Sequence, residues 1–188
     1  MQWSLSSENL DMAIICKEAA DKLMKTESDK FENKGVLVKN SDVILVKNNS
    51  IKRIGVIQNR NYQRYLAQMY CPNKEIFPFI GTGIAYALES NKVDAVVIDA
   101  FKAIKLKGNK ISTADRKGYD TYVLIVNKNF LGTKTYKEFV KLYNRSVEEI
   151  NMDSIYRKEV ESFLGKKISD SYWKEIKSWK IKFPQIEK

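Results

Sequence analysis

The stretch from residue 51 to residue 99 decides the fold. It contains IKRIGVI (51–57), EIFPFI (75–80) and VDAVVID (93–99), and the segment GTGIAYALES (81–90) separates the last two. Short apolar runs that alternate with segments of helical spacing indicate strands alternating with helices. The run VDAVVI has no regular polar alternation, which is typical of a strand covered on both faces. These features predict an α/β fold with a largely parallel sheet flanked by helices.

The alternation continues on both sides of this stretch. Further strands are expected over residues 10–16, in two pieces over 36–47 and over 121–126. Helices are expected over 17–24, 59–70 and 136–150, with two more amphipathic helices on either side of Gly165 and a polar loop over 108–118. Trp3, Trp173 and Trp179 are interpreted as packing residues, and Ser169 as the N-cap of the last helix.

The residue inventory excludes several kinds of chemistry. The 188 residues include no histidine and two cysteines, Cys16 and Cys71, which are 55 positions apart. A nucleophile activated by histidine and a histidine general base are therefore impossible. Two distant thiols also lack the spacing of a zinc site. We expect no catalysis, no metal and no cofactor.

The net charge of +10 has two interpretations, a basic functional face or a lysine-rich solvated surface. The lysines are scattered singly and form no block of five or six, which favours the solvated surface and no nucleic-acid partner. No run of eighteen apolar residues occurs, so no transmembrane helix is expected.

Residues 51–107 resemble the second lobe of type 2 periplasmic binding proteins, the solute receptors of ABC transporters, in the branch that binds sulfonates and pyrimidine precursors. The resemblance is carried by LESNKVDAVVID (88–99), which matches Val-Asp-Ala-hydrophobic-hydrophobic-x-Asp after a helix. LDMAIICKEAAD (10–21) resembles a first-lobe segment near the cleft of that family. TYVLIVNKNFL (121–131) resembles the strand that returns to the first lobe.

The resemblance implies two lobes, the first of them incomplete. Residues 1–40 would be part of the first lobe, 41–120 the second lobe, and 121–188 the return to the first lobe with C-terminal helices. The family's first two strand–helix units have no counterpart here. An incomplete lobe exposes a sheet edge, so a homodimer is expected. The location is cytoplasmic if Met1 is the true start, and extracytoplasmic and membrane-associated if a leader is missing.

The implied function is non-catalytic binding of a small solute, with an ABC permease as partner. The alternative is a cytoplasmic ligand-sensing or effector domain of the same fold. The missing signal sequence favours this alternative, and the lack of a preceding helix-turn-helix segment weakens it.

Candidate ligand-binding residues follow from the rule that ligands of open α/β sheets lie at the carboxyl ends of strands. They are Glu18, Ser41, Asn59, Arg60, Tyr62, Gly81, Thr82 and Asp99. Each also has a structural interpretation: a helix cap for Glu18 and Asn59, a solvated side chain for Arg60, core packing for Tyr62, a turn for Gly81 and Thr82. Asp99 would either bind an amine or support the hinge by accepting backbone N–H bonds.

Overall fold

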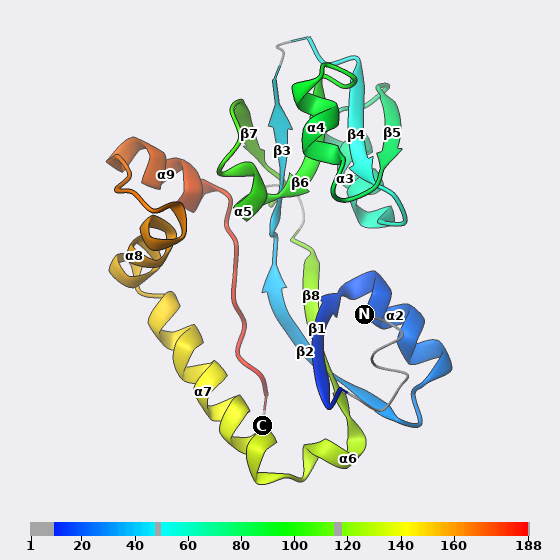
Figure 1. Cartoon of the computed structure of the whole chain (residues 1–188), viewed down its shortest axis with the longest axis vertical. Helices are drawn as coiled ribbons and strands as arrows, with labels where there is room; N and C mark the ends of the chain where they lie inside the picture. The colour runs from blue at the N-terminus through cyan, green and yellow to red at the C-terminus, as the bar shows by residue number, and fades with distance from the viewer. Residues whose placement is uncertain (1–9, 48–49, 115–117, 188) are drawn as a thin grey trace. The chain divides into compact units, whose positions relative to one another are not determined.

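The computed structural model describes residues 10–47, 50–114 and 118–187 of the chain. It divides into two compact units (Figure 1). The first unit comprises residues 1–39, 119–173 and 181–188, and the second comprises residues 40–118 and 174–180. The chain therefore passes between the units four times.

The first unit is built on a three-stranded antiparallel sheet. Its strands, in spatial order, are β1 (Met12–Cys16), β8 (Asp120–Asn127) and β2 (Phe31–Lys39). Residues of β8 pair with both neighbours, from Met12↔Val126 on one side to Phe31↔Asn127 on the other. The apolar run in β8 therefore becomes the central strand of this sheet.

Alternate side chains of β8 point to opposite faces of this sheet and pack against different helices. Val123 and Ile125 join the cluster formed with α2 (Lys17–Thr26), whereas Leu124 and Val126 join the cluster formed with α7 (Lys134–Ile150). Both faces are thus covered, which explains the uninterrupted apolar sequence of the strand. The remaining helices of this unit are α6 (Lys128–Leu131), α8 (Asp153–Leu164) and the first turn of α9 (Asp170–Ser178), whose later residues belong to the second unit.

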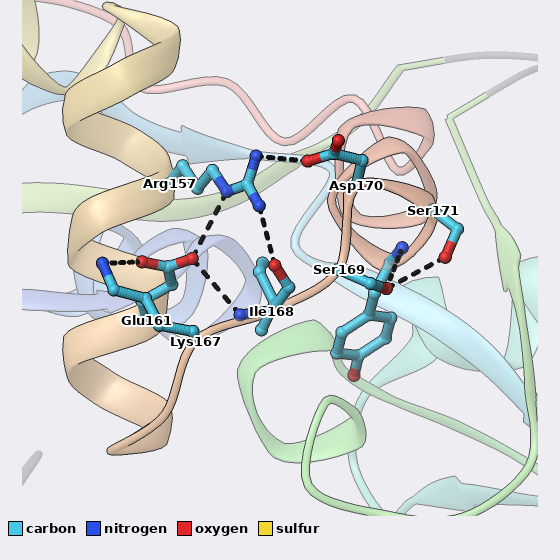
Figure 2. A network of polar contacts seen from close by, with 8 residues as sticks. Arg157, Glu161, Lys167, Ile168, Ser169, Asp170 and Ser171 are labelled. Carbon is cyan, nitrogen blue, oxygen red and sulfur yellow. Dashed lines mark hydrogen bonds and ion pairs between the residues drawn. The ribbon is translucent and has the colours of Figure 1, made fainter.

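An ion-pair network fixes the turn between α8 and α9 (Figure 2). The Arg157 guanidinium donates to Asp170 and to the Ile168 carbonyl, both at 2.7 Å, and to Glu161 at 3.3 Å. Glu161 also accepts from the Lys167 ammonium at 2.8 Å. These contacts hold down the pKa of Glu161. Its nearly buried carboxylate is therefore well compensated.

The second unit has a five-stranded mixed sheet. Its strands, in spatial order, are β5 (Glu75–Phe79), β4 (Arg53–Ile57), β6 (Ala95–Asp99), β3 (Asp42–Val46) and β7 (Asn109–Ser112). β4 is parallel to β5 and β6, whereas β3 is antiparallel to β6 and β7. The α/β class is confirmed, but a largely parallel arrangement holds only for β5, β4 and β6. An apolar run indicates that both faces of a strand are covered. It does not indicate whether the strand is parallel or antiparallel to its neighbours.

Helices cover this second sheet on both faces. The chain passes from β4 to β5 through α3 (Asn61–Tyr70) and back across the sheet to β6 through α4 (Ile84–Glu89). Since the two crossovers run in opposite directions, right-handed connections place α3 and α4 on opposite faces. The short α5 (Ala100–Ala103) follows β6 directly. It packs against β3 and β6, and every residue of β3 is buried.

Two local predictions were wrong. The polar segment 108–118 contains strand β7, because its backbone groups pair with β3 although its side chains are polar. Helix α3 begins at Asn61 and not at Asn59, because Asn59 takes a left-handed backbone conformation with φ 61° and turns the chain after β4.

Other local predictions are confirmed. Trp173 and Trp179 are buried, and the Ser169 hydroxyl accepts the Tyr172 N–H at 3.2 Å as an N-cap does. Trp3 lies outside the described residues. Within the described ranges no helix combines the length and apolar character that crossing a membrane requires.

Candidate functional site

The carboxyl ends of three strands and the start of a fourth meet at one edge of the second unit's sheet. β4, β5 and β6 run parallel and end there at Ile57, Phe79 and Asp99. β3 runs the other way, so its first residue, Asp42, pairs in register with Asp99. We call this edge, with residues 41–42, 58–63, 80–83 and 99–101, the carboxyl edge. It is where polar loop residues collect on an otherwise apolar sheet.

Asp42 is a buried acid of the carboxyl edge, with 1% of its surface exposed. Its carboxylate accepts from the Gln63 amide nitrogen at 2.8 Å, and Gln63 in turn accepts the Ile57 N–H at 2.9 Å. Burial and the nearby Asp99 carboxylate raise the pKa of Asp42 to about 6, against the opposing effects of Arg60, Tyr62 and Gln63. Asp42 therefore changes its charge near neutral pH.

Arg60 and Tyr62 form a pair at the beginning of α3. The Arg60 guanidinium donates to the Tyr62 hydroxyl at 2.7 Å, and its central carbon lies 5.9 Å from the centre of the Tyr62 ring. The Tyr62 hydroxyl also hydrogen-bonds Asp42 and lowers its pKa. The side chains of Arg60 and Tyr62 are both half-buried, so the pair is held in place yet is open to solvent.

Asp99 and Ser41 lie on the neighbouring strands of the same edge. Asp99 caps α5 by accepting the Phe101 N–H at 3.0 Å, and the Ser41 hydroxyl donates to its other oxygen at 3.4 Å. The Ser41 carbonyl accepts the Ala100 N–H at 2.7 Å. Burial raises the pKa of Asp99. Asp99 thus supports the connection between β6 and α5.

The remaining predicted site residues are Gly81, Thr82, Asn59 and Glu18. Gly81 and Thr82 form the turn after β5, close enough to β4 that a side-chain carbon on Gly81 would lie 3.8 Å from Ile57. Asn59 is exposed in the turn that follows β4. Glu18 stands in the first turn of α2, in the first unit. The structure therefore brings together Ser41, Arg60, Tyr62 and Asp99 around Asp42.

Sequence reasoning missed three members of the cluster. Asp42 and Gln63 are buried polar residues, and the Thr113 hydroxyl donates to the Asp42 carbonyl at 2.6 Å. The signal for Asp42 was present, because an acid directly before the fully apolar run VILV marks the polar end of a buried strand. Gln63 gives no comparable signal, since an amide within a helix is usually exposed.

This arrangement suits binding better than metal coordination. Among the described residues no group of three or more cysteine or acidic side chains has the geometry to hold a metal ion. The half-buried Arg60 presents a planar cation that can bind a carboxylate or phosphate with two hydrogen bonds. Ser41 and Asp99 supply a hydroxyl and a carboxylate on the same edge.

The comparisons with known proteins concern the fold. No protein-family model matches the sequence, and neither does any curated protein. Solved structures do match along nearly the whole chain. They include a ligand-binding component of an ABC-type import system and a methionine-binding protein, so the chain has a periplasmic-binding-protein-like fold.

Three of these structures illustrate the likeness. The ligand-binding component of an ABC-type import system from Staphylococcus aureus, solved with zinc bound, has a TM-score of 0.61 and 14% identity over 97% of this chain and 70% of its own. The methionine-binding protein MetQ has a TM-score of 0.61 and 13% identity over 98% of this chain and 82% of its own. A nutrient-binding protein from Burkholderia cenocepacia bound to methionine has a TM-score of 0.56 and 16% identity over 74% of this chain and 73% of its own.

These likenesses support the predicted fold but not the sulfonate and pyrimidine-precursor branch. The motifs that suggested this branch are short apolar strands with an acid at the end, such as VDAVVID. In the structure Val93 and Ala95 serve the core of the fold, and Asp99 caps a helix. Such features follow from the architecture and do not distinguish its ligand classes.

Proposed function

We propose that this protein binds a small polar solute at the carboxyl edge and catalyses no reaction. The observation that carries the proposal is the cluster of Arg60, Tyr62, Ser41 and Asp99 at the ends of β4, β3 and β6. In open α/β sheets this edge is where ligands bind, because loops there vary without disturbing the core.

In the proposal each residue of the cluster contacts a different chemical group of the solute. Arg60, at the start of α3, would bind an anionic group of the solute, with the positive end of the helix macrodipole adding to its charge. The Tyr62 ring would pack against the apolar part of the solute. Ser41 and Asp99 would receive a hydroxyl or amine, and the turn at Gly81 and Thr82 would let the solute approach the backbone. Asn59 completes the set of proposed contacts on this edge, and Glu18, in the first unit, stays a prediction from the sequence.

Amino acids are the first compounds to test. Structures of the same fold include proteins named for methionine, and a zwitterion offers both an anionic and a cationic group. By the same reasoning the biological partner would be an ABC-type permease that recognises the ligand-bound form. The expected homodimer also stays a prediction, and sedimentation equilibrium is its direct test.

A thermal-shift screen of amino acids and other small metabolites tests the proposal. A ligand present at a hundred times its Kd stabilises the folded state by about 2.7 kcal/mol, which raises the melting temperature by on the order of 5 °C in a chain of this size. Arg60→Gln should abolish the shift. Arg64→Gln, an exposed substitution one turn later on the same helix, should leave the shift intact. A screen without a stabilising compound would count against solute binding.

A further inference from the structure

A second hollow lies wholly within the first unit, along one side of α7. Its volume is about 680 Å³, which is within the usual range of small-molecule sites. Tyr136, Lys137, Val140 and Lys141 form its helical wall, and Lys34 of β2 stands opposite. We call this hollow the α7 groove. None of the carboxyl-edge residues lines it.

The walls of the α7 groove are fixed by hydrogen bonds to the C-terminal segment, which runs beside α7 (Figure 1). The Asn144 amide binds Ile186 twice, donating to its carbonyl at 3.0 Å and accepting its N–H at 2.8 Å. The Tyr143 hydroxyl contacts the carbonyls of Leu37 and Pro184 at 3.2 and 3.1 Å. These bonds tie α7 to the C-terminal segment beside the groove.

The groove joins an apolar floor to a cationic rim. Leu131 and Val140 pack against the core cluster beneath the groove and line its floor. The charged side chains that line it are Lys34, Lys137, Lys141, Arg145, Glu148 and Glu187. Four of these side chains are cations and two are acids, so which cations are available to a ligand depends on their ion pairs.

The cations of the rim are not equally available. Lys34 pairs with Glu32 at 2.9 Å, and Arg145 pairs with Glu149 at 3.1 Å. Lys137 and Lys141, by contrast, make no ion pair within the described part of the chain. Their spacing of four residues places both ammonium groups on the same side of α7. They form the free cationic pair of the groove.

Tyr136 adds an unsatisfied donor. Its side chain lines the groove with 7% of the residue exposed, and its buried hydroxyl has no hydrogen-bond partner among the described residues. Burial also raises the pKa of this hydroxyl, so it stays protonated. A protonated hydroxyl without an acceptor, in a groove that is also lined by the unpaired Lys137 and Lys141, favours a ligand that brings oxygen acceptors.

We propose that the α7 groove is a second ligand site, which binds a small amphipathic organic anion with its apolar body on Val140 and Leu131 and its anionic group between Lys137 and Lys141. This site is independent of the carboxyl edge. Its class of ligand differs as well, because the floor requires an extended apolar part. The charge requirement excludes an amphipathic cation.

Fluorescence titration with 1-anilinonaphthalene-8-sulfonate, an aromatic sulfonate, tests the groove on the full chain. We expect saturable binding that octanoate displaces and octylammonium does not. The double variant Lys137→Gln/Lys141→Gln should lower the affinity about tenfold, since each exposed charge contributes up to about a fivefold factor. Increasing salt should weaken the binding of the wild-type chain.

Lys134→Gln is the matched control. It removes the same charge from the same helix, but Lys134 is 91% exposed and lies outside the groove, so the affinity should not change. The proposal is overturned if the double variant binds like the wild-type chain, if Lys134→Gln weakens binding as much, or if octylammonium displaces the probe as well as octanoate. Arg60→Gln should leave this binding intact, which separates a failure here from a failure at the carboxyl edge.

Discussion

Asp42 and Asp94 are two buried acids of the second unit whose pKa values are shifted in opposite directions. Asp94 accepts the backbone N–H groups of Lys52 and Arg53 at 3.1 and 2.9 Å and pairs with the Arg53 guanidinium at 3.2 Å. The Arg53 contact is the main reason that the pKa of Asp94 falls to about 2. Asp42 lies in a drier place beside Asp99, and its pKa rises to about 6. One carboxylate stabilises the fold as an anion, whereas the other opposes it.

The substitution Asp42→Asn tests this difference through pH. Since the pKa of Asp42 is raised on folding, its favourable contribution is complete below about pH 4 and is lost as the pH rises through about 6. The neutral amide avoids that loss. We therefore expect Asp42→Asn to match the wild type near pH 4 and to be more stable by about 2 kcal/mol at pH 7.5, measured by urea unfolding.

Asp94→Asn is the control with the opposite sign. The contribution of Asp94 is present above about pH 4 and is lost as the pH falls through about 2. Its substitution should therefore lower the free energy of unfolding at pH 7.5 by about 1–3 kcal/mol. If both variants changed stability in the same direction at neutral pH, the assigned environment of Asp42 would be wrong.

At the scale of the elements, Gly108 is the point where the chain enters β7. Its backbone has φ 133°, and a side-chain carbon there would lie 2.6 Å from the Val46 carbonyl oxygen and 2.9 Å from the Leu45 side chain. The tight approach lets β7 pair with β3 from Asn109 onward. Only glycine permits both the backbone conformation and the contact.

Gly108→Ala should therefore destabilise the second unit by about 3 kcal/mol, through strain and overpacking together. Gly132→Ala is the matched control. No atom lies within 4 Å of a side-chain carbon at Gly132, and its φ of −77° suits alanine. That change should be neutral or stabilising by about 0.5 kcal/mol. Equal melting temperatures for the two variants would contradict the requirement for glycine at the start of β7.

The sequence predicted most elements because their apolar periodicity is strong. The runs AIIC, VILV and VVID all become strands, and the face pattern of α7 matches its observed packing. β7 was missed because its sequence, NKIS, has one apolar residue and its pairing comes from the backbone. The mixed strand order was missed because burial on both faces produces the same apolar run in parallel and antiparallel strands.

The candidate site was predicted in part for a related reason. A strand end followed by a polar residue is visible in the sequence, and this rule found Ser41, Arg60, Tyr62 and Asp99. Which of these residues gather around a common centre depends on strand order. Asp42 becomes that centre only because β3 runs antiparallel beside β6 and pairs it with Asp99.

For the whole molecule, the two proposed binding surfaces lie in different units. The carboxyl edge belongs to residues 40–118 of the second unit, whereas the α7 groove belongs to the first. The second unit contains 16 basic and 7 acidic residues, so almost all of the net charge of +10 lies there, and the first unit is nearly neutral. Net charge does not identify a ligand by itself. In the two proposals that role falls to Arg60 at the carboxyl edge, and to Lys137 and Lys141 at the groove.

Hydrogen exchange with and without a compound that raises the melting temperature tests the central claim most directly. The measurement reports which backbone amides a ligand protects. We expect added protection over residues 58–63, 80–83 and 99–101, and the loss of this protection in Arg60→Gln. If protection in these segments did not change, solute binding at the carboxyl edge would be contradicted, whether or not other segments gained protection.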